Sequence, residues 1–403
     1  MGFGIVELIS LLLSLAGFGI TPNPKAPTVD QALEYAMPDA DLVVQLDVGA
    51  VISNNYKTLL GLADQPQIKA SPELSQMVRQ IVNQAEGARG MAKSTTGIDV
   101  TTDVNDATMF FKFVPNHEPT VLVATHGKFT AATLDKIAGM VGKPTSKIGG
   151  GTYLEIDGKS AAGVTKSNVV LVGTQQLVKD RLADAWKAPA RPASSNLAYA
   201  AEVIGGKPVF ALITTLSPAA RKDANHELGA KGDNFGTDLV NRHKLAAFSV
   251  YANGIGWDWI DTKAGGVDQL ATMSEGIIEV FRAAQIAPRG IAKVLIAGLE
   301  SYKGVDKKID DVLAQKANVL KLVDSFTGDG KFVSKIDKTG MKLTVRLTGK
   351  TISEVVPFSM VIPAGAAWAL LERGAAAAPP PVEVVRPVKP VPQPKPRGTG
   401  LTK

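Results

Sequence analysis

The chain contains no cysteine among its 403 residues. A disulfide framework, a thiolate nucleophile and a thiolate-ligated zinc or iron–sulfur centre are therefore excluded. Histidine is also scarce, and no histidine stands four residues from another, so a helical metal pair of the His-Glu-x-x-His kind is absent. The four are His117, His126, His226 and His243. We therefore expect no metal and no cofactor.

Motifs of catalysis are missing as well. The sequence has no Gly-x-Ser-x-Gly nucleophile turn, no phosphate-binding Walker sequence and no Ser-x-x-Lys pair. Asp99, Asp103 and Asp106 could gather a hard cation, but their spacing lacks the glycine and the distal glutamate of an EF-hand loop. Trp257 and Trp259 alternate with Asp258 along an expected strand, which favours packing between a sheet and a helix. We assign no catalytic residue and do not expect an enzyme.

The first twenty residues are the most informative stretch. No charge occurs from Ile9 to Ile20, and a breaker sequence follows from Thr21 to Pro27. An apolar core of about 12 residues suits the central region of a secretory signal better than a membrane span, which needs roughly 20. The residues expected to form this membrane or export segment are Phe3, Glu7, Leu11, Leu12, Leu13, Leu15 and Phe18.

The start of the same stretch has a second interpretation. Gly2 to Leu8 resembles the processing site of type IV pilin-like proteins, in which a glycine precedes the new N-terminal phenylalanine. In that family a glutamate four residues later, here Glu7, is neutralised by the terminal amine of a neighbouring subunit. The resemblance implies a subunit of a pilin-like assembly. A third interpretation is an uncleaved helix that is buried or lies on a membrane surface.

The net charge of +6 is concentrated at the C-terminus. After Pro379 there are five basic residues and one acid, which leaves only +2 for the rest of the chain. Such a balanced body does not indicate nucleic-acid binding. Eight of the eighteen residues from Pro379 to Pro396 are proline, which favours a stiff polyproline II arm or a disordered tail. The tail residues expected to contact a partner are Arg386, Lys389, Lys395 and Arg397.

Hydrophobic periodicity divides the remainder into two similar units. Each runs strand, helices, hairpin, helix and then a hairpin or meander, which predicts an α+β fold that arose by duplication. We expect each unit to form an antiparallel sheet with helices packed on one face. The expected boundaries are a signal or anchor at 1–27, units at 28–187 and 196–350, a linker at 188–195, an apolar closing segment at 351–378, and the Pro-rich tail at 379–403.

Three stretches of the first unit resemble uncharacterised bacterial exported α+β proteins of duplicated build. They run from Asp39 to Asp47, from Tyr153 to Asp157 and from Val169 to Leu182. The resemblance implies the same fold and an envelope location. It supplies no catalytic residues.

These features predict a non-enzymatic binding or scaffolding protein of the bacterial cell envelope, periplasmic or associated with the outer membrane or surface. We expect the N-terminal segment to contact a membrane. We expect the tail to contact a protein or an anionic envelope polymer, with self-association as a further option. A periplasmic carrier that holds a hydrophobic ligand between sheet and helices is the alternative to scaffolding, beside the pilin-like subunit.

Overall fold

The computed structural model describes residues 26–349 except 54–55, 57–59, 62–71, 115–116, 194, 302, 305–309, 311–312, 315, 318–319 and 321–331. Its strands are β1 (Leu42–Leu46), β2 (Val104–Lys112), β3 (Thr120–Gly127), β4 (Ser146–Ile148), β5 (Gly151–Glu155), β6 (Ser160–Val164), β7 (Val169–Thr174), β8 (Phe210–Thr214), β9 (His243–Tyr251), β10 (Gly254–Asp261), β11 (Val333–Thr339) and β12 (Lys342–Thr348). Its helices are α2 (Val29–Ala32), the π-helical turn η1 (Gly49–Ser53), α5 (Pro72–Thr96), α6 (Ala131–Val141), α7 (Gln175–Leu182), α8 (Asn196–Gly205), α9 (Pro218–Ala230), α10 (Asn234–Arg242) and α11 (Ala264–Glu300).

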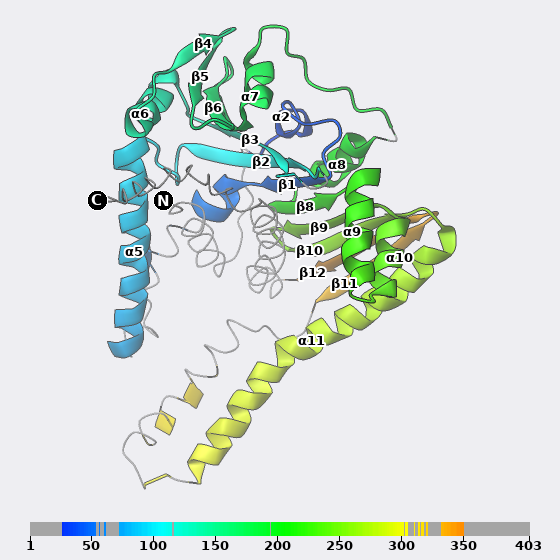
Figure 1. Cartoon of the computed structure of the whole chain (residues 1–403). Helices are drawn as coiled ribbons and strands as arrows, with labels where there is room; N and C mark the ends of the chain where they lie inside the picture. The colour runs from blue at the N-terminus through cyan, green and yellow to red at the C-terminus, as the bar shows by residue number, and fades with distance from the viewer. Residues whose placement is uncertain are drawn as a thin grey trace, which may run out of the picture.

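The described strands form one continuous twelve-stranded antiparallel sheet (Figure 1). Their order across the sheet is β11-β12-β10-β9-β8-β1-β2-β3-β7-β6-β5-β4. The α+β class expected from the sequence is therefore confirmed. The sheet is built from hairpins and meanders, and helices pack on it.

Strands β1 and β8 join the two halves of this sheet. Val43 of β1 lies opposite Phe110 of β2 on one side and opposite Ile213 of β8 on the other. The sequence-based expectation of one sheet per unit is thus wrong, because the units share a single sheet. The physical reason is that β1 and β8 are largely buried, and each would otherwise present an apolar edge with unpaired N–H and C=O groups.

Each half is built outward from this junction in the same order. From β1, the sheet continues through the β2–β3 hairpin to β7, and α6 connects β3 to the meander that ends at β7. From β8, it continues through the β9–β10 hairpin to β12, and α11 connects β10 to the final hairpin. Helices also separate the first strand from the hairpin in both halves.

Helices cover both faces of the sheet, which corrects the expectation of helices on one face only. Alternate residues along β1 face two hydrophobic cores, one on each side of the sheet. Val43 packs in the core with α2, α7 and α8, whereas Leu42 and Val44 belong to the core under α11. Helix α6 packs on β5, β6 and β7 through Leu134 and Ala138. The sheet therefore lies between two helical layers.

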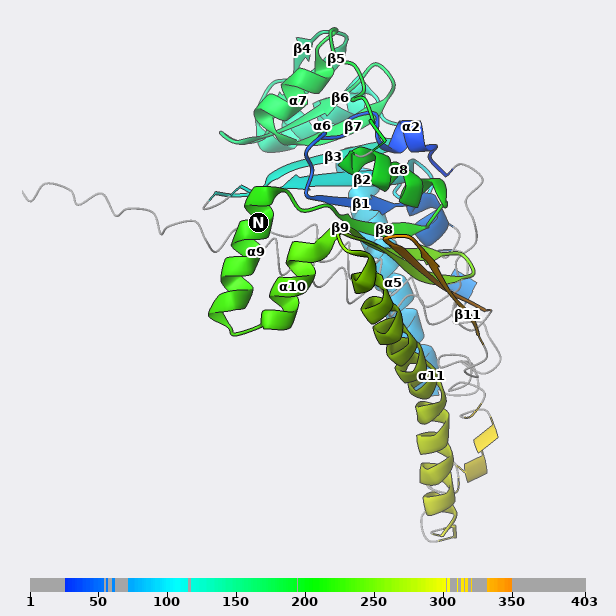
Figure 2. The ribbon, with the colours of Figure 1, turned by 90° about the vertical axis from the view of Figure 1, so that its right-hand side faces the viewer.

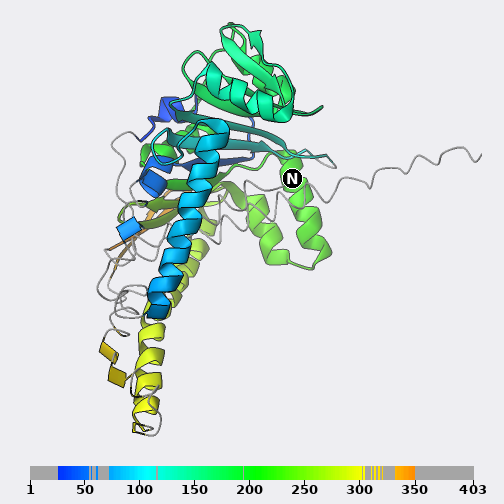
Figure 3. The ribbon, with the colours of Figure 1, turned by 90° about the vertical axis from the view of Figure 1, so that its left-hand side faces the viewer.

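Two long helices, α5 and α11, extend beyond the sheet on the same side (Figures 1 and 3). Helix α11 has 37 residues, which corresponds to a length of about 55 Å. The helix is continuous from Ala264 to Glu300. Its first part packs on β10, β11 and β12, and its second part continues past the edge strand β11 (Figure 2).

Candidate functional site

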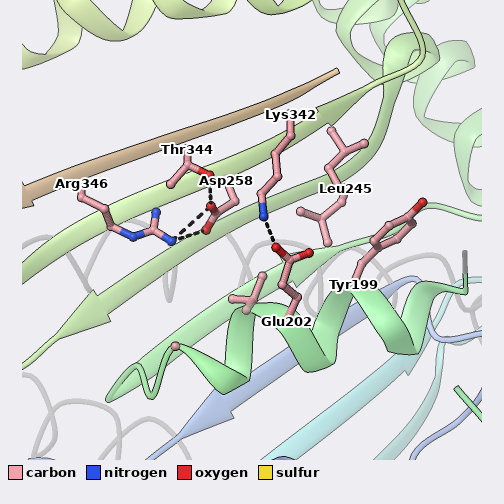
Figure 4. A pocket seen from close by; sticks show the side chains of 10 residues that line it. Tyr199, Glu202, Leu245, Asp258, Lys342, Thr344 and Arg346 are labelled. Atoms are coloured by element: carbon pink, nitrogen blue, oxygen red, sulfur yellow. Dashed lines mark hydrogen bonds and ion pairs between the residues drawn. The ribbon is translucent and has the colours of Figure 1, made fainter. Parts of the chain in front are cut away.

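A small cavity lies between α8 and the strands β9, β10 and β12 (Figure 4). Its volume is about 120 Å³. The lining residues are Tyr199, Glu202, Val203, Gly206, Leu245, Asp258, Ile260, Lys342, Thr344 and Arg346. It lies on the face of the sheet opposite α11, where β10 and β12 carry polar side chains.

The β10–β12 pairing places the central charges of this cavity. Asp258 lies directly opposite Thr344, and Arg346 lies opposite Gly256. The Arg346 Nη2 atom donates to both carboxylate oxygens of Asp258, at 2.9 and 3.1 Å, and the Thr344 hydroxyl donates to Asp258 Oδ1 at 2.9 Å. The absence of a side chain at Gly256 makes room, because a Cβ there would stand 2.7 Å from the Arg346 Cδ atom.

Further contacts hold the Arg346 side chain in place. Its Nη1 atom donates to the carbonyl oxygen of Val345 at 2.8 Å, and its guanidinium carbon lies 5.3 Å from the centre of the Tyr251 ring. Burial raises the pKa of Tyr251, so its hydroxyl stays neutral. The guanidinium is therefore fixed by a carboxylate, a carbonyl and an aromatic ring.

Helix α8 supplies the opposite wall of the cavity. The Ser195 hydroxyl caps this helix by accepting from the Ala198 N–H at 3.1 Å, which stabilises the start of the helix. Glu202 then points to Lys342, and the two form an ion pair at the rim (Figure 4). The Lys342–Glu202 pair is far more exposed than the Arg346–Asp258 pair.

This arrangement of paired charges suits ligand binding better than catalysis. The cavity presents charges of both signs, and each charged side chain in it has a partner. The Thr344 hydroxyl donates to the Asp258 carboxylate, which already accepts two hydrogen bonds from Arg346. The site can accept a small polar group by hydrogen bonds at its rim.

Each of the three aspartates considered as cation ligands has its own basic partner. Asp99 pairs with Arg89 at 2.7 Å, Asp103 with Lys128 at 3.1 Å, and Asp106 with His126 at 2.8 Å. The hydrogen bond from Arg89 holds the pKa of Asp99 well below its usual range. The hydrogen bond from the Asp99 N–H lowers the pKa of Asp103. Within the described residues, no three such side chains are grouped to hold a metal.

The tryptophans pack as expected between the sheet and a helix. Trp257 Nε1 donates to the hydroxyl of Ser274 on α11 at 2.9 Å. The Trp259 ring lies 5.3 Å from the ring of His243. Asp258 points to the other face, into the cavity, so the expected alternation along β10 is confirmed.

The residues expected to contact a membrane or a partner lie outside the described residues. These are the export or anchor residues, namely Phe3, Glu7, Leu11, Leu12, Leu13, Leu15 and Phe18, and the tail residues Arg386, Lys389, Lys395 and Arg397. The apolar stretch from Val355 to Leu371 lies outside them too. In the described part of the chain, none of the helices combines the length and apolar composition that a bilayer span requires.

Sequence reasoning missed the cavity and its ion pairs. The available signal was the alternation along β12, where Lys342, Thr344 and Arg346 are separated by apolar residues that face α11. Such a pattern predicts a polar sheet face. It does not indicate that Asp258, 88 residues away in sequence from Arg346, lies on the neighbouring strand.

The sequence matches no family model and no curated protein. A solved structure of the protein TP0453, in its crystal form IV, aligns with 81% of this chain and 96% of its own at 11% identity and a TM-score of 0.33. A TM-score of 0.33 does not establish a shared fold.

Proposed function

We propose that this chain is a non-enzymatic binding or scaffolding protein of the bacterial cell envelope. In this proposal the N-terminal apolar segment directs it to a membrane or an export route, and the sheet with its helices forms a rigid body. The basic Pro-rich tail contacts a protein or an anionic envelope polymer.

The observation that carries the binding role is the exposed apolar surface of α11. Ile277, Val280 and Val294 are 52%, 70% and 71% exposed on a helix that extends past the sheet. Met273 and Ile277 are four residues apart and Val280 follows three later, so these side chains lie along one side of the helix. Contiguous exposed apolar side chains are typical of an interaction surface.

The alternative role, carriage of a hydrophobic ligand, receives less support. Ligand cavities are commonly 300–1,000 Å³ and mostly apolar. The cavity beside α8 has about 120 Å³ and is lined by two ion pairs. An apolar ligand placed there would have to displace or bury charged groups, which is unfavourable.

We also propose that the two halves arose by duplication of one α+β unit. The support is the shared order of elements outward from β1 and from β8, with a helix joining each central hairpin to the outer strands. A duplicated unit whose first strands pair would give one large sheet with corresponding surfaces in each half.

N-terminal sequencing of the protein from fractionated cells tests the envelope location. A start at Ile20, after the small residues Gly17 and Gly19, indicates a cleaved signal. A start at Phe3 indicates pilin-like processing, and an uncleaved protein in the membrane fraction indicates an anchor. A protein that starts at Met1 and is found in the soluble cytoplasmic fraction contradicts the proposal.

Sedimentation with purified anionic envelope polymer tests the proposed role of the tail. Replacing Arg386, Lys389, Lys395 and Arg397 together by glutamine keeps every proline and removes four charges. We expect the variant to bind less and to lose the salt dependence of the parent chain. Replacing Lys93, Lys128, Lys159 and Lys166 by glutamine is the control, because it removes four exposed lysines from the folded body. Equal loss in both variants contradicts a specific role of the tail.

A further inference from the structure

Strand β11 is the edge of the sheet next to β12, and its outer side has no strand beside it in the described part of the chain. It has seven residues, whereas β4 at the opposite edge has three. A long edge strand offers a row of N–H and C=O groups to another strand. Since short edges resist such pairing, β11 is the stronger candidate for it.

The side chains of β11 alternate between the two faces of the sheet. Ile336 lies opposite Val345 of β12 and faces the core under α11. Lys335 and Asp337 therefore face the other side, where they are 75% and 50% exposed and stand 3.7 Å apart. The exposed face of β11 thus carries a cation, Lys335, just before Ile336 and an anion, Asp337, just after it.

We propose that β11 is a self-association surface, on which a second copy of this chain pairs its own β11 in the antiparallel direction about Ile336. A two-fold axis perpendicular to the sheet then places Ile336 opposite its own copy. Lys335 of each copy lies opposite Asp337 of the other, which gives two ion pairs across the interface.

Other registers of the same strand are less favourable. Centring the axis on Lys335 places two lysines opposite each other, and centring it on Asp337 does the same for two aspartates. Like charges directly opposite are destabilising in a sheet. The register about Ile336 also pairs all seven residues and covers Val333, which is 69% exposed, with Thr339 of the second copy.

Helix α11 leaves this edge accessible. It contacts β11 near both ends of the strand, where Arg282 donates to the Ser334 hydroxyl at 3.1 Å and the Lys338 ammonium donates to Asp268 at 2.8 Å. Phe281 also lies against Phe332, just before the strand. These contacts are on one face of the sheet, whereas strand pairing uses the N–H and C=O groups in its plane. The inference stands apart from the proposed envelope role, because it depends only on this edge.

Cysteine cross-linking in the full-length protein tests the register, and the chain has no cysteine that could interfere. We expect Ile336→Cys to form a disulfide-linked dimer under mild oxidation. Ser334→Cys alone should not, because its two copies would stand four residues apart along the strands, or about 14 Å, beyond disulfide reach. A mixture of Ser334→Cys and Lys338→Cys proteins should cross-link again, since these positions lie opposite each other.

The second test exchanges the charges of β11 and measures dimer formation by sedimentation velocity on full-length protein in the same buffer. Lys335→Asp should weaken the dimer about tenfold or more, because it places a second carboxylate opposite Asp337 at each end of the contact. Adding Asp337→Lys should restore it. Circular dichroism checks that the variants fold. A parent chain that stays monomeric, Ser334→Cys that cross-links as well as Ile336→Cys, or no rescue in the double variant would overturn the proposal.

Discussion

Arg346 donates to both carboxylate oxygens of Asp258 across the neighbouring strands β12 and β10. The Asp258 side chain is only 4% exposed, and that of Arg346 is 29% exposed. Because a charge buried without its partner is strongly unfavourable, this pair links the last hairpin to the sheet through Asp258.

Replacing Arg346 by methionine should therefore destabilise the protein. The expected loss in the free energy of unfolding is roughly 3 kcal/mol, because Asp258 stays buried without its cation. Urea denaturation followed by circular dichroism measures it. The control is Lys342→Met, which removes the exposed partner of Glu202 and should cost less than about 1 kcal/mol. Equal losses in the two variants would show that burial of Asp258 is not the cause.

The ion pair between Arg89 and Asp99 should make the free energy of unfolding depend on pH in the acidic range. The hydrogen bond from Arg89 lowers the pKa of the buried Asp99 carboxyl below its ordinary value of 3.8. The folded state therefore binds this proton more weakly than the unfolded state. The stabilisation is present above about pH 4 and is lost as the pH falls towards the lowered pKa.

Asp99→Asn tests this dependence. At neutral pH the variant should be less stable by roughly 3 kcal/mol, and its stability should fall less steeply below about pH 4 than that of the parent chain. Urea denaturation at several pH values measures both effects. Lys93→Met is the control, since Lys93 is 61% exposed and stands 3.5 Å from Asp99. An unchanged slope in the asparagine variant would refute the assignment to Asp99.

Much of the local structure follows from the sequence. The apolar run at Leu42 predicts a central strand, and Asn253-Gly254 predicts the turn between β9 and β10. Ser71-Pro72 predicts the start of α5, which begins at Pro72. These features depend on a few neighbouring residues, so a linear pattern can reveal them.

The features that define the whole molecule depend on distant residues. The pairing of β1 with β8 joins residues about 170 positions apart, such as Val43 and Ile213. Two apolar strands can each be central in separate sheets or adjacent in one, and their sequences are the same in both cases. Helix α8 is hard to predict from the sequence, because its apolar positions follow directly on the Pro-rich linker that ends at Ser195.

Arg181 should stabilise the docking of α2. It is a buried cation whose Nε and Nη2 atoms donate to the carbonyl oxygens of Tyr35 and Ala36, at 3.1 and 3.2 Å. Its guanidinium lies 4.5 Å from the centre of the Trp186 ring, and burial lowers its pKa. The Arg181 side chain, on α7, thus satisfies two carbonyls of the segment that follows α2, about 145 residues earlier in the sequence.

Arg181→Met should leave those two carbonyls without donors and cost roughly 3 kcal/mol of unfolding free energy. Hydrogen exchange should show faster exchange at the amides that follow α2 than elsewhere in the sheet. Lys179→Met is the control on the same helix, since Lys179 lies over the Tyr153 ring at 5.3 Å and donates to no backbone carbonyl there. Equal exchange throughout the protein in the Arg181 variant would argue against a local role.

The junction of β1 and β8 should make the two halves unfold together. Ile213 of β8 is fully buried and lies opposite Val43 of β1. Ile213→Ala should lower the free energy of unfolding by roughly 3 kcal/mol, through lost burial and the cavity left behind. Hydrogen exchange should then accelerate equally in the β2–β3 and β9–β10 hairpins, because they lie on opposite sides of the same junction.

A matched control and a second signal complete this test. Val280→Ala removes methyl groups from a side chain that is 70% exposed, and it should change the stability by less than about 0.5 kcal/mol. Single-tryptophan variants that retain Trp186 or Trp257 follow the two halves separately during urea denaturation. Coincident transitions, shifted together by Ile213→Ala, are expected because both cores are continuous across the junction strands. Two separate transitions would mean that β1–β8 pairing holds independent units side by side without coupling their unfolding.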